Sequence, residues 1–287
     1  MAEQKTTKKK RQSPLVGITL LALAVLALVF YLLGGLRVHR GSRAAQPDIA
    51  QNVAALAEIE RQPAVDLDIE ARQKRLALLR EHNGVMVESL AGEQEKILRL
   101  TDVDKADLQR WFNGTVIIGD SLTLAISEYK WLPSPPVVAK IGISVSPDLS
   151  ALDKVEAANP TMIFLCFGMN DIEAYKSDVG RFIEKYTATV QRLQASLPYT
   201  AIYVNGVFPV SEKTLAKKSY FGYVDTYNAE LQKMCDSLGA FFVDSGFIVR
   251  REPSYYDADG MHMKSKFYPL WLTYLADVSG LSNDDEQ

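Results

Sequence analysis

The stretch Thr-Val-Ile-Ile-Gly-Asp-Ser-Leu, residues 115–122, decides the fold of this 287-residue chain. It opens with a short apolar run that ends in glycine, the pattern of a strand buried on both faces. A helical pattern follows at once, from residue 122 to 130, until Pro133 and its neighbours break it. The stretch therefore predicts a strand that turns directly into a helix, with Ser121 at the turn.

The same alternation continues along the rest of the chain. Further apolar runs of strand length occupy residues 137–141, 161–167, 201–207 and 241–244. Helical patterns occupy residues 148–158, 177–197, 223–238 and 264–278. Short apolar strands that alternate with helices predict an α/β fold, in which helices cover both faces of a parallel sheet.

Residues suited to catalysis follow the predicted strands. Ser121 follows the first strand, Gly142 the second and Asn170 the third. Asp259 and His262 lie in the loop before the last helix. The carboxyl ends of parallel strands meet at one edge of the sheet, where sites form in such folds. We therefore expect these residues to converge at that edge.

A serine nucleophile needs a base, and His262 is the only histidine after residue 113. If a histidine activates Ser121, elimination selects His262. Asp259, three residues earlier, could orient the imidazole, and Asp257 is its rival. The alternative interpretation of Ser121 is a plain helix cap, because serine is preferred at helix N-termini.

Acyl transfer also needs donors for the negative charge that develops on the carbonyl oxygen. The backbone N–H of Ser121 is one candidate. Gly142 has no side chain, so its N–H can approach a substrate closely, and the Asn170 amide could be a third donor. We interpret Asp120 and Asp171 as structural residues that bond the loop backbone.

These segments resemble the SGNH/GDSL hydrolases, a family named for a Ser, a Gly, an Asn and a His in four blocks. The matches are Ser121 in GDSL, Gly142 in IGIS, Asn170 in GMND and His262 in DGMH, within residues 114–280. The resemblance implies a three-layer α/β/α sandwich with a flavodoxin-like sheet. It implies a triad of Ser121, His262 and Asp259. It also implies an oxyanion hole of the Ser121 N–H, the Gly142 N–H and the Asn170 side chain, without a cofactor.

A segment near the N-terminus is predicted to be a membrane anchor. Residues 14–36 carry no charge and are long enough for a bilayer span, which needs about 20 residues. A cleaved signal peptide is the alternative, although its apolar core is usually about 7–15 residues long. Basic residues are more numerous before the run than just after it, which favours a cytoplasmic N-terminus. We expect a basic cytoplasmic tail at 1–13, a single-pass cell-membrane anchor at 14–36 and an extracytoplasmic catalytic domain.

Residues 37–113 are predicted to form a helical stalk that precedes the hydrolase domain at 114–287. Asn83-Gly84 predicts the stop of one helix, and further helices are expected at 87–100 and 105–112. A spacer is one interpretation of the stalk and an oligomerising coiled coil is the other. The oligomeric state is left open.

The distribution of charge along the chain indicates which class of ligand the C-terminal domain does not bind. Residues 1–113 carry 17 Lys/Arg and 14 Asp/Glu, a net +3, whereas residues 114–287 carry 15 and 21, a net −6. An acidic domain argues against nucleic acid as a ligand. Cys166 and Cys235 are expected to be buried thiols, and no Cys/His cluster has metal-ligand spacing. The segment 208–221 could be a substrate-facing lip, and Tyr255-Tyr256 could line a pocket.

Together these features predict an extracytoplasmic serine esterase. Its substrate is expected to be an acylated small molecule or glycan, with a short acyl group such as O-acetyl on a cell-envelope or extracellular glycan. An O-acyltransferase that passes the acyl group to a glycan hydroxyl is the first alternative, because the same acyl-enzyme serves both reactions. A non-catalytic module that binds a glycan or a partner protein is the second.

Overall fold

The computed structural model describes residues 64–133 and 136–282, and these residues belong to one compact unit. The predicted cytoplasmic tail at 1–13, the membrane anchor at 14–36 and the first part of the stalk lie outside the described residues and stay predictions. Among the helices that the structure describes, none combines the length and the apolar character needed to cross a bilayer.

A parallel sheet forms the centre of the unit. Its strands are β1 (Thr115–Gly119), β2 (Val137–Ala139), β3 (Met162–Cys166), β4 (Ala201–Asn205) and β5 (Phe241–Val243). They lie in the order β2-β1-β3-β4-β5, with every neighbouring pair parallel. Every residue of β1, β3 and β4 is buried, as expected for strands covered on both faces. The predicted α/β class is confirmed, and the order is that of a flavodoxin-like doubly wound sheet.

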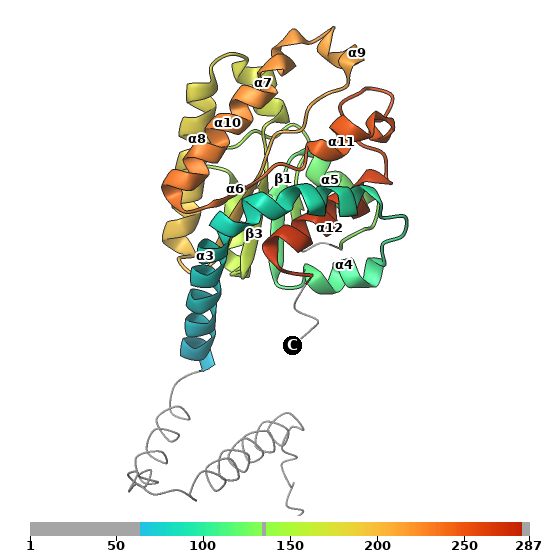
Figure 1. Ribbon diagram of the computed structural model, residues 1–287. Coiled ribbons are helices and arrows are strands. Elements are labelled where there is room, and N and C mark those ends of the chain that lie inside the picture. The colour runs from blue at the N-terminus through green and yellow to red at the C-terminus, as the bar shows by residue number, and fades with distance from the viewer. Residues whose placement is uncertain (1–63, 134–135, 283–287) are drawn as a thin grey trace, which may run out of the picture. The chain divides into compact units, whose positions relative to one another are not determined.

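Helices flank the sheet. Those that connect successive strands or follow the last one are α5 (Ser121–Glu128), α6 (Ser150–Ala158), α7 (Met169–Tyr175), α8 (Val179–Ser196), α10 (Val224–Leu238) and α12 (Phe267–Ser279). Helix α8 contacts α6 and α10, and α8 and α10 lie side by side in Figure 1. Helix α8 buries Phe182, Tyr186, Val190 and Leu193, which recur at helical spacing on one face.

Helix α12 is almost entirely buried. Phe267, Trp271 and Tyr274 are at most 1% exposed. Phe208, just after β4, packs edge-on against Phe267 and Trp271 with ring centroids 5.4 and 5.2 Å apart. Helix α12 therefore packs at the carboxyl end of β4, against the start of the connection between β4 and α10.

In the part of the chain that the structure describes, two helices precede the sheet, α3 (Ala64–Leu98) and α4 (Lys105–Trp111). The predicted stop at Asn83-Gly84 is wrong, because α3 runs through both residues. A glycine inside a helix costs only about 1 kcal/mol relative to alanine, which the packing of a long helix can outweigh. Both helices contact α12 (Figure 1). The side chains of Ile97 and Leu108 are fully buried. The domain limits of the chain stay a prediction, but these helices are packed onto the unit and do not hold it at a distance.

Four short helices complete the described chain: α9 (Glu212–Leu215), η1 (Ser219–Tyr223), α11 (Phe247–Arg251) and η2 (Pro253–Tyr255). The first two belong to the connection between β4 and α10, residues 206–223, which we call the β4–α10 segment. It includes the stretch that the sequence predicted as a possible lip. Cys166 and Cys235 are both buried free thiols, as expected.

Candidate active site

Ser121 is the first residue of α5, at the carboxyl end of β1. Asp120 caps this helix, because its Oδ1 accepts a hydrogen bond from the Leu122 N–H at 3.0 Å. Gly119 is required at the turn, since a Cβ there would clash with Thr123 Oγ1 and the Cys166 carbonyl. The close approach of β1, β3 and α5 therefore fixes where the serine hydroxyl emerges.

The Ser121 hydroxyl contacts the imidazole of His262, although 141 positions separate them in the chain. Ser121 Oγ lies 3.0 Å from His262 Nε2. The two residues thus meet at the sheet edge where the sequence placed them. The His262 side chain is 46% exposed, so the pair is open to solvent.

His262 is held by Asp259 within a short loop, residues 256–263, which we call the Asp–His loop. An isolated antiparallel bridge between Tyr256 and Met263 closes it. Asp259 Oδ2 lies 2.6 Å from His262 Nδ1. An ionised carboxylate cannot donate, so this contact places a proton on Nδ1 and leaves Nε2 free to accept from Ser121.

The other carboxylate oxygen of Asp259 shapes the loop. Its Oδ1 accepts hydrogen bonds from the backbone N–H groups of Met261 and His262, both at 2.9 Å. Burial by itself would raise the pKa of Asp259, but the hydrogen bonds from the His262 ring and from these N–H groups hold it below its ordinary value. Asp259 is therefore ionised where it faces the imidazole.

The rival carboxylate, Asp257, does not take this position. Its Oδ1 accepts from the Ala258 N–H at 2.7 Å, and its own N–H donates to the His262 carbonyl at 2.8 Å. Asp257 thus pairs with His262 through the backbone, across the loop. Between the two candidates, only Asp259 contacts the imidazole with its carboxylate.

Asn170 lies at the start of α7, after β3, and points toward the loop that follows β2. Its Nδ2 donates to the Ile143 carbonyl at 3.0 Å and to Asp120 Oδ2 at 3.3 Å. Gly142, one residue before Ile143, sits in an exposed turn with φ of 73°. Asn170 is therefore hydrogen-bonded to Asp120, the residue before Ser121. Gly142 lies in the loop after β2, next to Ile143, and is not among the residues that form the Ser–His–Asp contacts.

Two buried carboxyls support this part of the site. Asp171 Oδ1 accepts from the Val145 N–H at 3.1 Å and thereby ties the post-β2 loop to α7. Burial raises the pKa of Asp171 to about 7 and that of Asp120 to about 6. Both residues bond loop or helix backbone, as predicted from the sequence.

One of the two tyrosines predicted as a possible pocket lining, Tyr256, connects two loops. Tyr256 is buried, and its hydroxyl donates to the Pro209 carbonyl at 2.8 Å. It therefore links the Asp–His loop to the β4–α10 segment. Two further contacts between that segment and the loop, from the Ser211 N–H and the Thr214 hydroxyl, were not predicted from the sequence. No motif or periodicity marked them, because the segment has no regular pattern.

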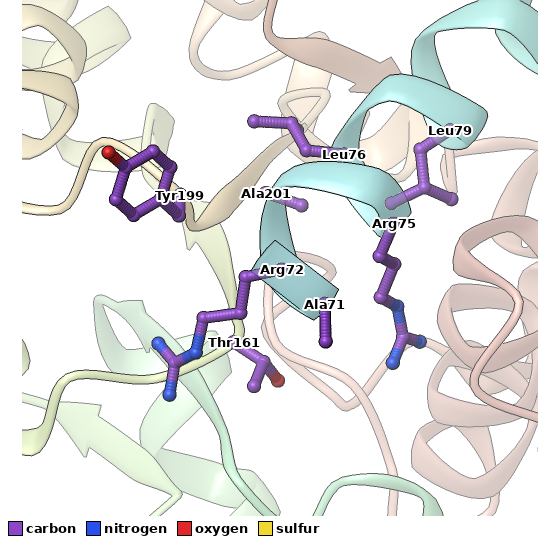
Figure 2. Close-up of a pocket in the computed structure, with 8 residues that line it drawn as sticks. All are labelled: Ala71, Arg72, Arg75, Leu76, Leu79, Thr161, Tyr199 and Ala201. Carbon is purple, nitrogen blue, oxygen red and sulfur yellow. The ribbon is translucent and has the colours of Figure 1, made fainter. Parts of the chain in front are cut away.

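One hollow borders the neighbours of Ser121, and another lies at the opposite edge of the sheet. A cavity of about 10 Å³ borders Asp120 and Leu122, the neighbours of Ser121, and is otherwise walled by apolar side chains and Asn205. A pocket of about 200 Å³ lies between α3 and residues Thr161, Tyr199 and Ala201, at the amino ends of β3 and β4 (Figure 2). Sites of this fold form at the opposite edge of the sheet, so the larger pocket is separate from the serine.

Within the described residues, no group of three or more His, Cys, Asp or Glu side chains is arranged to hold a metal ion. At the carboxyl edge of the sheet, the Ser121 hydroxyl contacts the His262 imidazole, which contacts the Asp259 carboxylate. The N-terminus of α5 and the Asn170 amide lie next to these groups. Such an arrangement can activate a serine and stabilise an oxyanion.

A comparison with protein families identifies the class. The sequence profile of the GDSL-like Lipase/Acylhydrolase family matches residues 117–269, just over half of the chain. The chain therefore belongs to this family, and the resemblance to the SGNH/GDSL hydrolases is confirmed. Its enzyme class is that of the serine ester hydrolases. No curated protein sequence matches the chain.

Several solved structures resemble the chain at low sequence identity. A carbohydrate esterase family 3 protein from Talaromyces cellulolyticus is 15% identical, with a TM-score of 0.46 over 59% of this chain and 98% of its own. A variant of Axe2, an acetyl-xylooligosaccharide esterase from Geobacillus stearmophilus, is 16% identical, with a TM-score of 0.43 over 58% and 93%. LAE5, an α/β hydrolase from the metagenome of Lake Arreo, Spain, is 18% identical, with a TM-score of 0.44 over 59% and 96%. At these values the likeness decides nothing about the substrate.

Proposed function

We propose that the protein hydrolyses short acyl esters, with Ser121 as nucleophile, His262 as general base and acid, and Asp259 as the residue that orients the imidazole. One observation carries the proposal. Contacts of 3.0 and 2.6 Å connect the Ser121 hydroxyl, both ring nitrogens of His262 and the Asp259 carboxylate in one line. That order of groups is the one that serine acyl transfer requires.

The reaction would proceed through an acyl-enzyme. Ser121 Oγ attacks the ester carbonyl carbon while His262 Nε2 takes the hydroxyl proton. The tetrahedral intermediate expels the alcohol, which receives that proton from His262, and the acyl group remains on Ser121. Water then attacks the acyl carbon, His262 takes its proton and returns it to Ser121 as the acid leaves.

The negative charge on the substrate oxygen would be met by the Ser121 N–H at the start of α5, where the helix has unpaired N–H groups. Asn170 is the second donor in the proposal. It can keep its 3.0 Å bond to the Ile143 carbonyl and exchange the longer contact with Asp120 for the oxyanion. The Gly142 N–H, in the same post-β2 loop, is the third proposed donor.

The size and openness of the site support a short acyl group and hydrolysis. The cavity of about 10 Å³ that borders Asp120 and Leu122 is at the lower limit for a single water molecule, so it has no room for a long acyl chain. The half-exposed His262 gives water access to the acyl-enzyme, as hydrolysis requires. An open site can also accept a bulky alcohol, and we therefore propose an O-acetylated glycan as the substrate.

The proposed place of action is outside the cytoplasm. The apolar residues 14–36, with more basic residues before them than just after them, support a single-pass anchor with a cytoplasmic N-terminus. Protease added to intact cells should then digest the domain from outside. A domain that is degraded only after the cells are lysed would contradict this orientation.

The catalytic proposal is tested by Ser121→Ala on p-nitrophenyl acetate. We expect kcat to fall by roughly 10⁴-fold or more, since the proposed acyl-enzyme forms on the Ser121 hydroxyl. Ser127→Ala, in the same helix, is the matched control and should retain activity. Circular dichroism should show both variants folded. Turnover of the Ser121 variant near the wild-type rate would remove Ser121 from the mechanism.

A further inference from the structure

The β4–α10 segment contacts the Asp–His loop through consecutive backbone carbonyls. The Thr214 hydroxyl donates to the Asp259 carbonyl at 2.8 Å. The Ser211 N–H donates to the Gly260 carbonyl, also at 2.8 Å. These contacts reach the loop from residues 45 or more positions earlier in the chain.

The contact is too close to admit a side chain at the turn of the loop. Gly260 has a φ of 69°, a backbone conformation that favours glycine. A Cβ there would clash with both Ser211 Oγ and Thr214 Oγ1. The two hydroxyls therefore define how far the turn after Asp259 can move toward the segment.

The segment is itself anchored on both sides. Ser211 Oγ donates to Thr214 Oγ1 at 3.1 Å, and Thr214 is only 7% exposed. Farther along, the hydroxyl of Tyr220 donates to Glu173 of α7 at 2.9 Å. Since α7 also carries Asn170, the segment connects both halves of the proposed site.

These contacts fix Asp259 from two directions. Its carboxylate binds the His262 ring and two N–H groups of its own loop, while its carbonyl is held from outside by Thr214. The loop is short and half exposed, and its own hydrogen bonds do not set its distance from the rest of the domain. An error of about 1 Å in a catalytic constellation can cost about 10²-fold in rate.

We propose that Thr214 is a positioning residue of the reaction: its hydroxyl holds the main chain of Asp259 so that the carboxylate stays on His262 Nδ1. The inference rests on the proposed function for its kinetic consequence, but the position of the carboxylate can be measured without turnover.

The test replaces the hydroxyl by a methyl group in Thr214→Val. We expect kcat for p-nitrophenyl acetate to fall by about tenfold, the usual scale for one lost hydrogen bond to a positioned group, with KM unchanged. Thr214→Ser, which keeps the hydroxyl, should restore kcat to within about twofold. A loss of rate that Thr214→Ser does not restore would overturn the proposal.

Thr200→Val is the matched control. The Thr200 hydroxyl donates to the Pro160 carbonyl at 2.7 Å and is equally buried, but it lies before β4 at the amino end of the sheet. Its loss should lower the unfolding midpoint without lowering kcat. An equal loss of kcat in both valine variants would show a general effect of stability and would contradict the positioning role.

A proton resonance separates this inference from the ester hydrolase proposal. The short Asp259–His262 contact should give a downfield Nδ1 proton signal in the wild type at low temperature. The signal should move upfield or broaden in Thr214→Val and stay in place in Thr200→Val. An unchanged signal in Thr214→Val would refute the positioning role even if wild-type ester hydrolysis were absent. If Thr214→Val fails to fold, Thr214→Ala removes the same hydroxyl and takes its place with the same expected outcomes. Ser211→Ala, which leaves the Thr214–Asp259 bond intact, should have a smaller effect than the Thr214 variant. A larger one would contradict the inference.

Discussion

Replacement of Asp259 by asparagine tests how the imidazole is oriented. An Asn side chain can still accept the two backbone N–H groups at 2.9 Å, so the loop should keep its shape. It cannot serve as a carboxylate for His262 Nδ1. If its amide turns the NH₂ group toward the ring, Nδ1 must become the acceptor and the proton moves to Nε2. Nε2 then donates to Ser121 instead of accepting from it.

The magnitude follows from exposure. A buried orienting aspartate contributes about 10⁴ to kcat in serine hydrolases. The Asp259 side chain is 48% exposed, so water can replace part of its interaction with the imidazolium that forms. We therefore expect kcat for p-nitrophenyl acetate to fall by about 10²–10³-fold in Asp259→Asn, with little change in KM.

Asp257→Asn is the matched control, because it makes the same change two residues away in the same loop. The Asp257 carboxylate bonds only its neighbouring N–H among the described contacts, so kcat should stay within about threefold of the wild type. Steady-state initial rates at constant pH measure both variants. Loss of less than about threefold in Asp259→Asn, or an equal loss in Asp257→Asn, would refute the assigned orientation of His262.

Further predictions concern the oxyanion donor, a buried carboxyl and the first helix. Asn170→Ala should lower kcat for the same ester by about 10²–10³-fold, and activity within about threefold would exclude the amide as an oxyanion donor. Burial raises the pKa of Asp171 to about 7, well above the unfolded value of about 3.9, so the folded state keeps a proton that the unfolded chain releases. Stability should therefore fall as pH rises from about 4 to about 7. In Asp171→Asn the melting temperature should depend less on pH across that range, and the dependence that remains is the part due to Asp120. A slope unchanged in Asp171→Asn would show that this carboxyl does not titrate there. Ile97→Ala should lower the unfolding free energy by about 2–4 kcal/mol in urea titrations, because the side chain is fully buried. A loss typical of an exposed residue would show that α3 does not pack on the domain.

Much of the sheet could be predicted because its strands are continuous apolar runs. The residues of β1 and β3 fall within the predicted strands and are buried throughout. β2 is shorter than predicted and stops at Ala139, since Ile141 is 69% exposed before the turn at Gly142. Hydrophobicity alone could not show this, because an apolar side chain in a turn looks like one in a strand.

The convergence of Ser121 and His262 followed from topology, because parallel strands bring their carboxyl ends to one edge. The choice between Asp257 and Asp259 needed the loop geometry, since both lie close to the histidine in sequence. The contact from Thr214 to Asp259 could not be predicted at all. It joins two irregular connections that are 45 positions apart, and neither carries a periodic signal.

The most direct test of the central claim identifies the atom that reacts. A p-nitrophenyl phosphonate should form one covalent adduct per chain, and mass spectrometry of the digested protein should place it on the peptide that contains Ser121. The adduct should be absent from His262→Ala, because the serine then lacks its base. An adduct on another residue, or equal labelling of the His262 variant, would contradict the account of Ser121 as a nucleophile activated by His262.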